Sequence, residues 1–297
     1  MTRTKRCRRP GRQILARRDD EGTDEHMSFE GQTWWVTGAS SGIGAALARR
    51  LGERGSRVIL SGRDETRLAE VAATVATETL TLPFDVRDEA AMLDATDRAI
   101  EWSGGIDGFV ANAGVSQRSR AVNTEMKVYR ELIEIDLMSQ IAATQALLPH
   151  VTGRGSGQLV FISSIAGKVG VPMRTAYSAA KFGLVGYADA LRAELSQTGV
   201  TVHVIYPGSV ATAVSTNALT SDGSKRGRSD AVIDNGIAPD VAAETMLDAL
   251  AAREREIIVA QGFELAMGEM RRTPDELLDQ VAAMVAAGYM DQMEAES

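Results

Sequence analysis

The sequence predicts an α/β protein with a mostly parallel sheet of seven strands and helices on both faces. Seven short apolar runs alternate with helical patterns from residue 32 onward. The runs are apolar at nearly every position, which is typical of strands that are buried on both faces of a parallel sheet. No internal repeat and no linker interrupts residues 28–262. We therefore expect a single doubly wound, Rossmann-type domain over this range.

The expected elements follow one another regularly along the chain. The strands are expected at 32–38, 57–62, 80–86, 106–114, 157–164, 200–208 and 256–260. The helices are expected at 42–55, 64–76, 88–104, 124–151, 176–199 and 240–254. In the first helix, Ile43, Leu47 and Leu51 share one face. Asp64 is a candidate N-cap for the second helix.

The two ends of the chain differ from this core. Residues 1–27 form an N-terminal tail that holds eight Arg or Lys and five Asp or Glu. We interpret this tail as a disordered extension or as translation begun upstream of Met27. An arm that binds nucleic acid or an anionic membrane is the alternative. Residues 263–297 read as a helical extension, in which Leu277, Val281, Met284 and Val285 form one stripe. That stripe predicts core or oligomer packing, with a lid over the site as the alternative.

Composition excludes several classes of function. The net charge is −8, so nucleic acid is not an expected partner. No apolar run approaches the roughly 18 residues of a membrane span. The one cysteine, Cys7, allows neither an intrachain disulfide nor a cysteine-based zinc site, and we expect no metal and a cytoplasmic location.

A glycine-rich segment, "TGASSGIG" at 37–44, joins the first strand to the first helix. Gly38 allows a tight turn, Gly42 allows close approach of a pyrophosphate, and Gly44 allows the helix to pack close to the sheet. The start of a helix offers unpaired N–H groups to phosphates. We expect a dinucleotide to be bound by residues of this segment: Gly38, Ser40, Ser41, Gly42, Ile43 and Gly44.

With this segment the sequence resembles the short-chain dehydrogenase/reductase family over about residues 30–262. The other motifs are "FDV" at 84–86, "NAG" at 112–114, "SSIAG" at 163–167, "YSAAK" at 177–181 and "PGSVAT" at 207–212. The resemblance implies that Asp85 and Val86 hold the adenine and that Asn112, Ala113 and Gly114 line the cofactor. It also implies that residues 207–212 cap the nicotinamide carboxamide, with Pro207, Gly208, Val210 and Thr212 as the expected contacts.

The end of the second strand indicates which nicotinamide cofactor is preferred. An acidic residue there generally accepts the ribose hydroxyl of NAD. By resemblance to the family, this position is Gly62, and the next residue is Arg63, whose guanidinium can pair with the 2′-phosphate of NADP. Ser40 can add a hydroxyl. The alternative is that Asp64 holds the ribose of NAD, but its expected role as a helix cap favours NADP.

Tyr177 and Lys181 lie four residues apart, which puts both on one helix face. A free phenol has a pKa near 10, and a nearby ammonium favours its ionised form. Ser164 ends the fifth strand at the same edge of the sheet. We expect Ser164 to steady a carbonyl oxygen while Tyr177 donates a proton, and we expect Tyr177 and Lys181 to contact the cofactor also. Ser163 is expected to be structural, because alternation along the strand points it elsewhere.

One residue departs from the family pattern. Asp136 occupies the position at which the family usually has an Asn in its proton relay. The backbone carbonyl and a water can carry much of that relay, and Asp is compatible with both. A carboxylate near Lys181 can instead offset the charge that activates Tyr177.

These observations predict an NADP-dependent oxidoreductase that interconverts an alcohol and a ketone or aldehyde. The resemblance extends to a branch proposed to act on lipophilic alcohols, and family members self-associate, so we expect a homodimer or homotetramer. The long polar segment 213–239 is expected to set specificity and to move as a lid. Its "KRGR" at 225–228 either attracts an anionic substrate or is merely solvated.

Two other functions remain open at this stage. A cofactor-binding sensor or scaffold without turnover is the first alternative, although such proteins usually lose the Tyr or the Lys. An epimerase or dehydratase of nucleotide sugars is the second, although these usually carry longer substrate domains.

Overall fold

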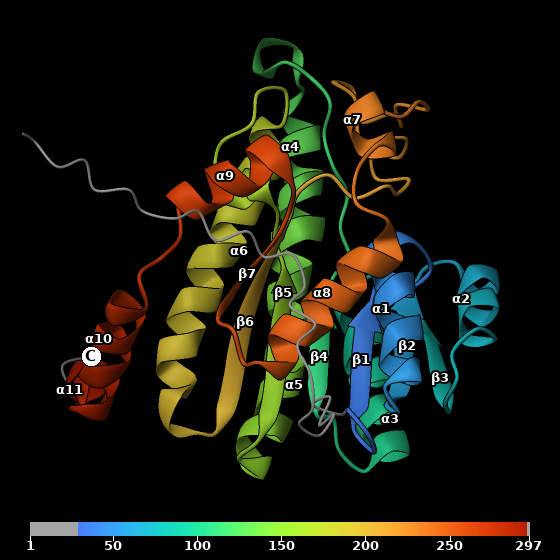
Figure 1. The fold of residues 1–297 in the computed structure, drawn as a ribbon. Helices are drawn as coiled ribbons and strands as arrows, with labels where there is room; N and C mark the ends of the chain where they lie inside the picture. Colours follow the sequence, from blue (N-terminus) through green and yellow to red (C-terminus); the bar gives the residue numbers. More distant parts are fainter. Residues whose placement is uncertain (1–28, 296–297) are drawn as a thin grey trace, which may run out of the picture.

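The computed structural model describes residues 29–295, so the expected N-terminal extension lies outside the described residues. The described chain forms one sheet of seven strands in the order β3-β2-β1-β4-β5-β6-β7 (Figure 1). Every neighbouring pair of named strands is parallel. Helices cover both faces. The predicted fold class is therefore confirmed, and the sheet is fully rather than mostly parallel.

The elements follow the predicted alternation. The strands are β1 (Thr33–Thr37), β2 (Arg57–Gly62), β3 (Thr79–Pro83), β4 (Gly108–Ala111), β5 (Gly157–Ile162), β6 (Val200–Pro207) and β7 (Glu256–Val259). The helices of the domain are α1 (Gly42–Glu53), α2 (Glu65–Ala72), α3 (Glu89–Ser103), α4 (Met126–Ile133), α5 (Ser139–Arg154), α6 (Thr175–Glu194), α7 (Ala231–Asp234) and α8 (Pro239–Ala251). Strand ends therefore differ from the predicted ends by a few residues.

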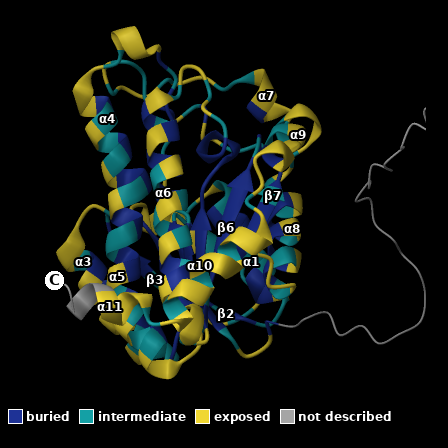
Figure 2. Ribbon diagram, turned by 90° about the vertical axis from the view of Figure 1, so that its left-hand side faces the viewer, coloured by how far each residue is buried: buried dark blue, intermediate teal, exposed yellow. Residues whose placement is uncertain are grey.

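Two adjacent tryptophans in β1 illustrate why the sheet needs two covering layers. Side chains alternate across a strand, so Trp34 and Trp35 point to opposite faces. Both are fully buried. Trp34 packs in a core with residues of α1 and α8, whereas Trp35 packs in a second core with residues of α3, α5 and α6. Figure 2 shows the strands as a buried layer within the half-exposed helices.

The order of the strands determines where a ligand can bind. The chain runs outward from β1 through β2 to β3, and then returns to β4 on the other side of β1. The connections that leave the carboxyl ends of β1 and β4 therefore diverge, and in open α/β sheets a crevice forms at this point. All the sequence-predicted site residues except Asp136, Tyr177 and Lys181 lie at or just beyond carboxyl ends of strands.

The helix predicted at 124–151 is not regular. Between α4 and α5 the backbone forms a π-helical turn, η2 (Glu134–Met138), and the buried Asp136 is at its centre. A π-helical turn inserts one extra residue into a helix, and such turns are frequent at functional sites. The apolar periodicity of the sequence did not reveal it.

The C-terminal residues form three helices: α9 (Gly262–Met270), α10 (Asp275–Ala286) and α11 (Tyr289–Ala295). Helix α10 contacts α6 and the short helix η4 (Leu195–Gln197) that follows it, at the opposite end of α6 from Tyr177 (Figure 1). Leu277, Val281 and Met284 are 50%, 40% and 49% exposed. The interpretation of this stripe as core was therefore wrong. The stripe lies on α10, away from Tyr177, and packing against another copy stays a prediction.

Candidate active site

The glycine-rich segment joins β1 to α1 with three glycines whose geometry no other residue would permit without strain. Gly38 and Gly42 adopt left-handed φ values of 66° and 56°, which favour glycine. A Cβ on Gly44 would overlap the carbonyl oxygen of Gly38 and lie 2.6 Å from Asn112 Nδ2. The Ser41 side chain makes no hydrogen bond to the first turn of α1. The start of α1 is thus held close to the sheet, where its N–H groups can receive a phosphate.

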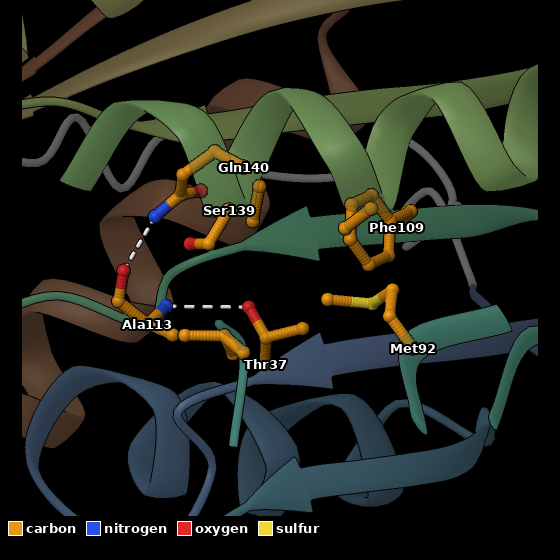
Figure 3. Close-up of a pocket in the computed structure, with 9 residues that line it drawn as sticks. Thr37, Met92, Phe109, Ala113, Ser139 and Gln140 are labelled. Carbon is orange, nitrogen blue, oxygen red and sulfur yellow. Dashed lines mark hydrogen bonds between the residues drawn. The ribbon is translucent and has the colours of Figure 1, made fainter. Parts of the chain in front are cut away.

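The "NAG" residues are held beside β1 by a threonine and a glutamine (Figure 3). Thr37 Oγ1 accepts hydrogen bonds from the backbone N–H groups of Asn112 and Ala113, at 3.0 and 3.2 Å. Asn112 Nδ2 donates to the carbonyl of Thr37 at 2.9 Å. Gln140 of α5 donates to the carbonyl of Ala113 at 2.5 Å. These bonds fix the wall that the family resemblance assigns to the cofactor.

Three charged residues meet where β2 and β3 end. Arg87 donates from Nη2 and Nε to the Asp85 carboxylate, at 2.6 and 3.0 Å. These bonds lower the pKa of Asp85 to about 2. Arg63 Nη1 lies 4.0 Å from Asp85 Oδ2, and its side chain is 61% exposed. Sequence reasoning missed Arg87, although it follows "FDV" by one residue.

The immediate neighbours of Arg63 bear on the choice of cofactor. A Cβ on Gly62 would lie 3.4 Å from Ser40 Oγ, so the hydroxyl of Ser40 is close to the end of β2. Asp64 is the N-cap of α2 and accepts a hydrogen bond from the Arg67 N–H at 3.0 Å. The predicted cap is therefore present. The Asp64 carboxylate is engaged by its own helix.

Lys181 and Asp136 form a buried ion pair. Lys181 Nζ lies 3.1 Å from Asp136 Oδ1 and donates to the carbonyl of Ile162, at the end of β5, at 3.0 Å. Asp136 accepts a further hydrogen bond from the Val115 N–H at 3.2 Å. Glycine is needed at position 114, since a Cβ there would overlap Asp136 Oδ1. Burial raises the pKa of Asp136, while Lys181 opposes that rise.

Tyr177 lies one turn before Lys181 on α6, and its ring is half-buried. The ammonium of Lys181 lies 5.8 Å from the centroid of the ring. Ser164 follows β5, and its Oγ accepts from the Ala166 N–H at 3.1 Å and contacts the carbonyl of Pro207 at 3.4 Å. Ser163 donates to the carbonyl of Lys181 at 3.1 Å. Ser163 therefore has the structural contact that alternation indicated.

The segment 207–212 is held by a residue of the C-terminal extension. Glu264 of α9 accepts hydrogen bonds from the N–H and the Oγ of Ser209, at 2.7 and 3.0 Å. Val210 forms a bridge with Ile237, and a Cβ on Gly42 would lie 3.1 Å from Thr212. The segment thus faces the glycine-rich turn. Sequence reasoning missed Glu264, because only the folded chain brings α9 to this loop.

The segment 213–239 docks on residues 116–119 at two points. The Arg118 N–H donates to the Leu219 carbonyl at 2.8 Å, and Arg118 Nε donates to Asp230 Oδ2 at 2.7 Å. Arg226, from "KRGR", also binds Asp230 and is largely buried. Lys225 and Arg228 are exposed. Of this basic run, Arg226 is therefore an internal anchor.

The described chain lacks two further features. Residues 29–295 contain no group of three or more His, Cys, Asp or Glu side chains that could hold a metal ion. Within the same range, no helix has both the length and the apolar character needed to cross a membrane.

Comparisons with known proteins agree on one family. The sequence profile of the short chain dehydrogenase family matches residues 32–222. Dehydrogenase/reductase SDR family member 7B of Danio rerio is 38% identical over 234 residues, which cover 76% of each chain. Dehydrogenase/reductase SDR family protein 7-like of Anopheles gambiae is 35% identical over 255 residues, which cover 83% of this chain and 80% of that protein.

Solved structures share the fold. A short-chain dehydrogenase from Streptomyces avermitilis matches with a TM-score of 0.71 and 27% identity, covering 88% of this chain and 99% of that one. A short chain dehydrogenase/reductase from Burkholderia phymatum, solved in complex with NAD, matches with a TM-score of 0.73 and 21% identity over 83% of this chain and 97% of that one.

We predict that Gly44→Ala impairs cofactor binding, because the added methyl group would push α1 away from Gly38. The dissociation constant of the variant for NADPH should rise at least about tenfold. Its free energy of unfolding should fall by about 1–3 kcal/mol. NADPH fluorescence titration and chemical denaturation measure the two effects. Gly153→Ala is the matched control, since its Cβ meets nothing within 4 Å. It should bind normally and gain up to about 1 kcal/mol of stability. Unchanged binding by Gly44→Ala would contradict the role of this close approach.

Proposed function

The chain belongs to the short chain dehydrogenase family and is an oxidoreductase of that family, and we propose that it interconverts an alcohol and its ketone or aldehyde with NADP as cofactor. The observation that carries this proposal is the arrangement around Lys181. Its buried ammonium lies 5.8 Å from the ring of Tyr177 and 3.0 Å from the carbonyl that ends β5, two residues before Ser164. These contacts support a site at the carboxyl edge of the sheet in which Tyr177 is the acid, Lys181 the cation and Ser164 the hydroxyl.

The residues of this edge fit a nicotinamide dinucleotide. The close approach of Gly44 to Gly38 leaves a helix start that can take a pyrophosphate. Asp85 and Val86 would hold the adenine, residues 112–114 would line the middle, and residues 207–212 would contact the carboxamide. When bound in its reduced form, the cofactor supplies a hydride to the carbonyl carbon.

The side chains would act together on the carbonyl oxygen. Tyr177 donates its hydroxyl proton to that oxygen as the carbonyl becomes an alcohol. Lys181 favours the resulting phenolate through its positive charge. Ser164 donates a hydrogen bond that orients the oxygen and stabilises the negative charge that develops on it. Oxidation of an alcohol runs through the same contacts in reverse.

The preference for NADP is supported by the charges at the end of β2. No acidic side chain occupies position 62, and Arg63 is 61% exposed and free to turn toward a 2′-phosphate. Asp64 is occupied as the cap of α2, which disfavours its use as the acceptor of a ribose hydroxyl. Ser40 lies beside Gly62 and can add a hydrogen bond to the same phosphate.

Asp136 would have two opposing effects on the reaction. Its carboxylate holds Lys181 in position through the contact of 3.1 Å. The same negative charge offsets part of the positive charge that Tyr177 experiences. We propose that the chain retains activity with this residue.

The remaining parts of the proposal concern the substrate and the assembly. Val115, Tyr129 and Leu219 pack with Tyr177 against one small core, so an apolar wall lies beside the acid. This wall supports a substrate with an apolar portion. We further propose that the protein forms a homodimer or homotetramer through α5 and α6, and that it works in the reducing cytoplasm.

Tyr177→Phe should abolish most of the activity, because it removes the proton donor and little else. Across a panel of ketones, aldehydes and alcohols, kcat/KM should fall about 10²- to 10⁴-fold. The dissociation constant for NADPH should stay within about twofold. Tyr187→Phe, on the same helix but facing Gln145, is the matched control and should keep its activity. NADPH binding by the unaltered protein without turnover of any panel compound would instead indicate a sensor or scaffold.

Arg63→Ala should reduce the preference for NADPH, since it removes the partner proposed for the 2′-phosphate. A charge-assisted hydrogen bond contributes about 1.5–3 kcal/mol, so kcat/KM for NADPH should fall about 10- to 100-fold. The value for NADH should change little. Arg67→Ala removes an exposed arginine one turn later and should leave both values unchanged. Initial rates with NADH that match those with NADPH in the unaltered protein would show the assignment to be wrong.

Asp136→Asn should keep most of the activity, because the amide oxygen can still accept from the Val115 N–H and from Lys181. Asp136→Leu removes both acceptors and should lower kcat at least about tenfold, since a hydrogen bond to a charged group contributes about 1.5–3 kcal/mol. Steady-state kinetics of the two variants measure the effect. A kcat of Asp136→Leu equal to that of the parent would mean that the contact with Lys181 does not position the site.

A further inference from the structure

One cation at the candidate site has no partner. Arg174 is the N-cap residue of α6, three positions before Tyr177, and the phenol of Tyr177 is among the groups near its guanidinium. Within the described part of the chain, its guanidinium has neither a hydrogen bond nor an ion pair. The residue is nevertheless half-buried. Burying a charge without a partner is costly, and proteins rarely do so without a reason.

The charged groups near Arg174 do not neutralise it. They are Arg118, Asp230 and Glu264, and the phenol of Tyr177 also lies near the guanidinium. Asp230 is already bound by Arg118 and Arg226, and Glu264 is bound by the N–H and hydroxyl of Ser209. Burial, and then the charge of Arg118, lower the pKa of Arg174. The local field therefore favours the arrival of an additional anion.

The backbone fixes Arg174 in this position. Met173 has a φ of 64°, in the left-handed region that a non-glycine residue adopts at a cost of roughly 1 kcal/mol or more. Its carbonyl accepts from the Ser119 N–H at 3.0 Å. Gln117 Oε1 accepts from the Ala176 N–H at 2.8 Å and so caps the start of α6. The turn is thus fastened to residues 117–119 on both sides of Arg174.

From these contacts we propose that Arg174 binds an anionic group of the substrate, a carboxylate or a phosphate, while the carbonyl of the same molecule lies at Tyr177. The planar guanidinium matches either group with two parallel hydrogen bonds. The apolar wall of Val115, Tyr129 and Leu219 takes the carbon chain between them. The substrate is then an oxo acid or a phosphorylated ketone, and this assignment rests on the function proposed above.

Matched pairs of compounds test the assignment with the full chain and NADPH. Oxo acids of increasing length, from 4-oxopentanoate to 12-oxododecanoate, are each compared with their methyl ester, and hydroxyacetone phosphate is compared with hydroxyacetone. The ratio of kcat/KM between the two members of a pair measures how much the anionic group of the substrate contributes to the reaction. The variants are Arg174→Gln, Arg174→Lys and the control Arg120→Gln, which removes an exposed arginine two residues after Arg118.

The expected result is a preference of at least about tenfold for the anionic member of one or more pairs, as befits a charge-assisted bond. Arg174→Gln should remove this preference through KM, Arg174→Lys should keep part of it, and Arg120→Gln should keep nearly all. Turnover of the neutral partners should be unchanged. The acid and phosphate pairs separately identify which anion is preferred.

A second measurement separates this inference from the proposed reaction. Saturation-transfer NMR on the Tyr177→Phe protein with NADPH measures binding of the same pairs without turnover. A preference for the anion that Arg174→Gln abolishes supports the anion site even if no compound is reduced. Neutral partners that bind and react as well as the anions in every pair overturn it, even if ketones are reduced. Weaker NADPH binding by Arg174→Gln also overturns it, since Arg174 would then contact the cofactor.

Discussion

The buried contact between Lys181 and Asp136 holds the candidate site together. Through one ammonium it joins the end of β5, the π-helical turn before α5 and the first turns of α6. These three elements lie far apart in the sequence, and each carries or borders a group that the proposed reaction needs. An unpaired ammonium buried at this depth would destabilise the fold. Lys181 therefore needs both its ion pair with Asp136 and its hydrogen bond to the carbonyl of Ile162. Tyr177 lies one turn before Lys181 on α6, so this contact also anchors the part of the helix that carries Tyr177.

The sequence predicts well those features that depend on local patterns. Apolar runs separated by helices fix the parallel sheet, and Asp64 fixes the start of α2 through its own hydrogen bond to Arg67. The family motifs identify the neighbourhood of the site, because each follows a strand or opens a helix. The π-helical turn is different. It depends on the fit of Asp136 between Val115 and Lys181, which apolar periodicity does not encode.

Two of the residues that the sequence analysis missed have partners that are distant along the chain. Glu264 meets Ser209 from the C-terminal extension, and Arg118 meets Asp230 across the segment that was expected to be a polar lid. Arg174 is recognised as unpaired only in the folded chain, where the acidic residues near it, Asp230 and Glu264, already bind other groups. The exposed stripe of Leu277, Val281 and Met284 failed as a core prediction for a related reason: apolar periodicity indicates a face, but not what covers it.

The double attachment of the segment after β6 has a consequence for how substrate range can change. Leu219 and Asp230 both bind Arg118, so the residues between them form a loop, here called the cassette, whose two ends are attached to the same arginine. Loop-closure entropy grows only slowly with length. Insertions or exchanges inside the cassette can therefore reshape the entrance while Tyr177 and Lys181, which belong to α6, keep their places. Recombination or directed evolution at 220–225, which leaves Arg226 and its contact with Asp230 in place, should alter selectivity without rebuilding the catalytic edge.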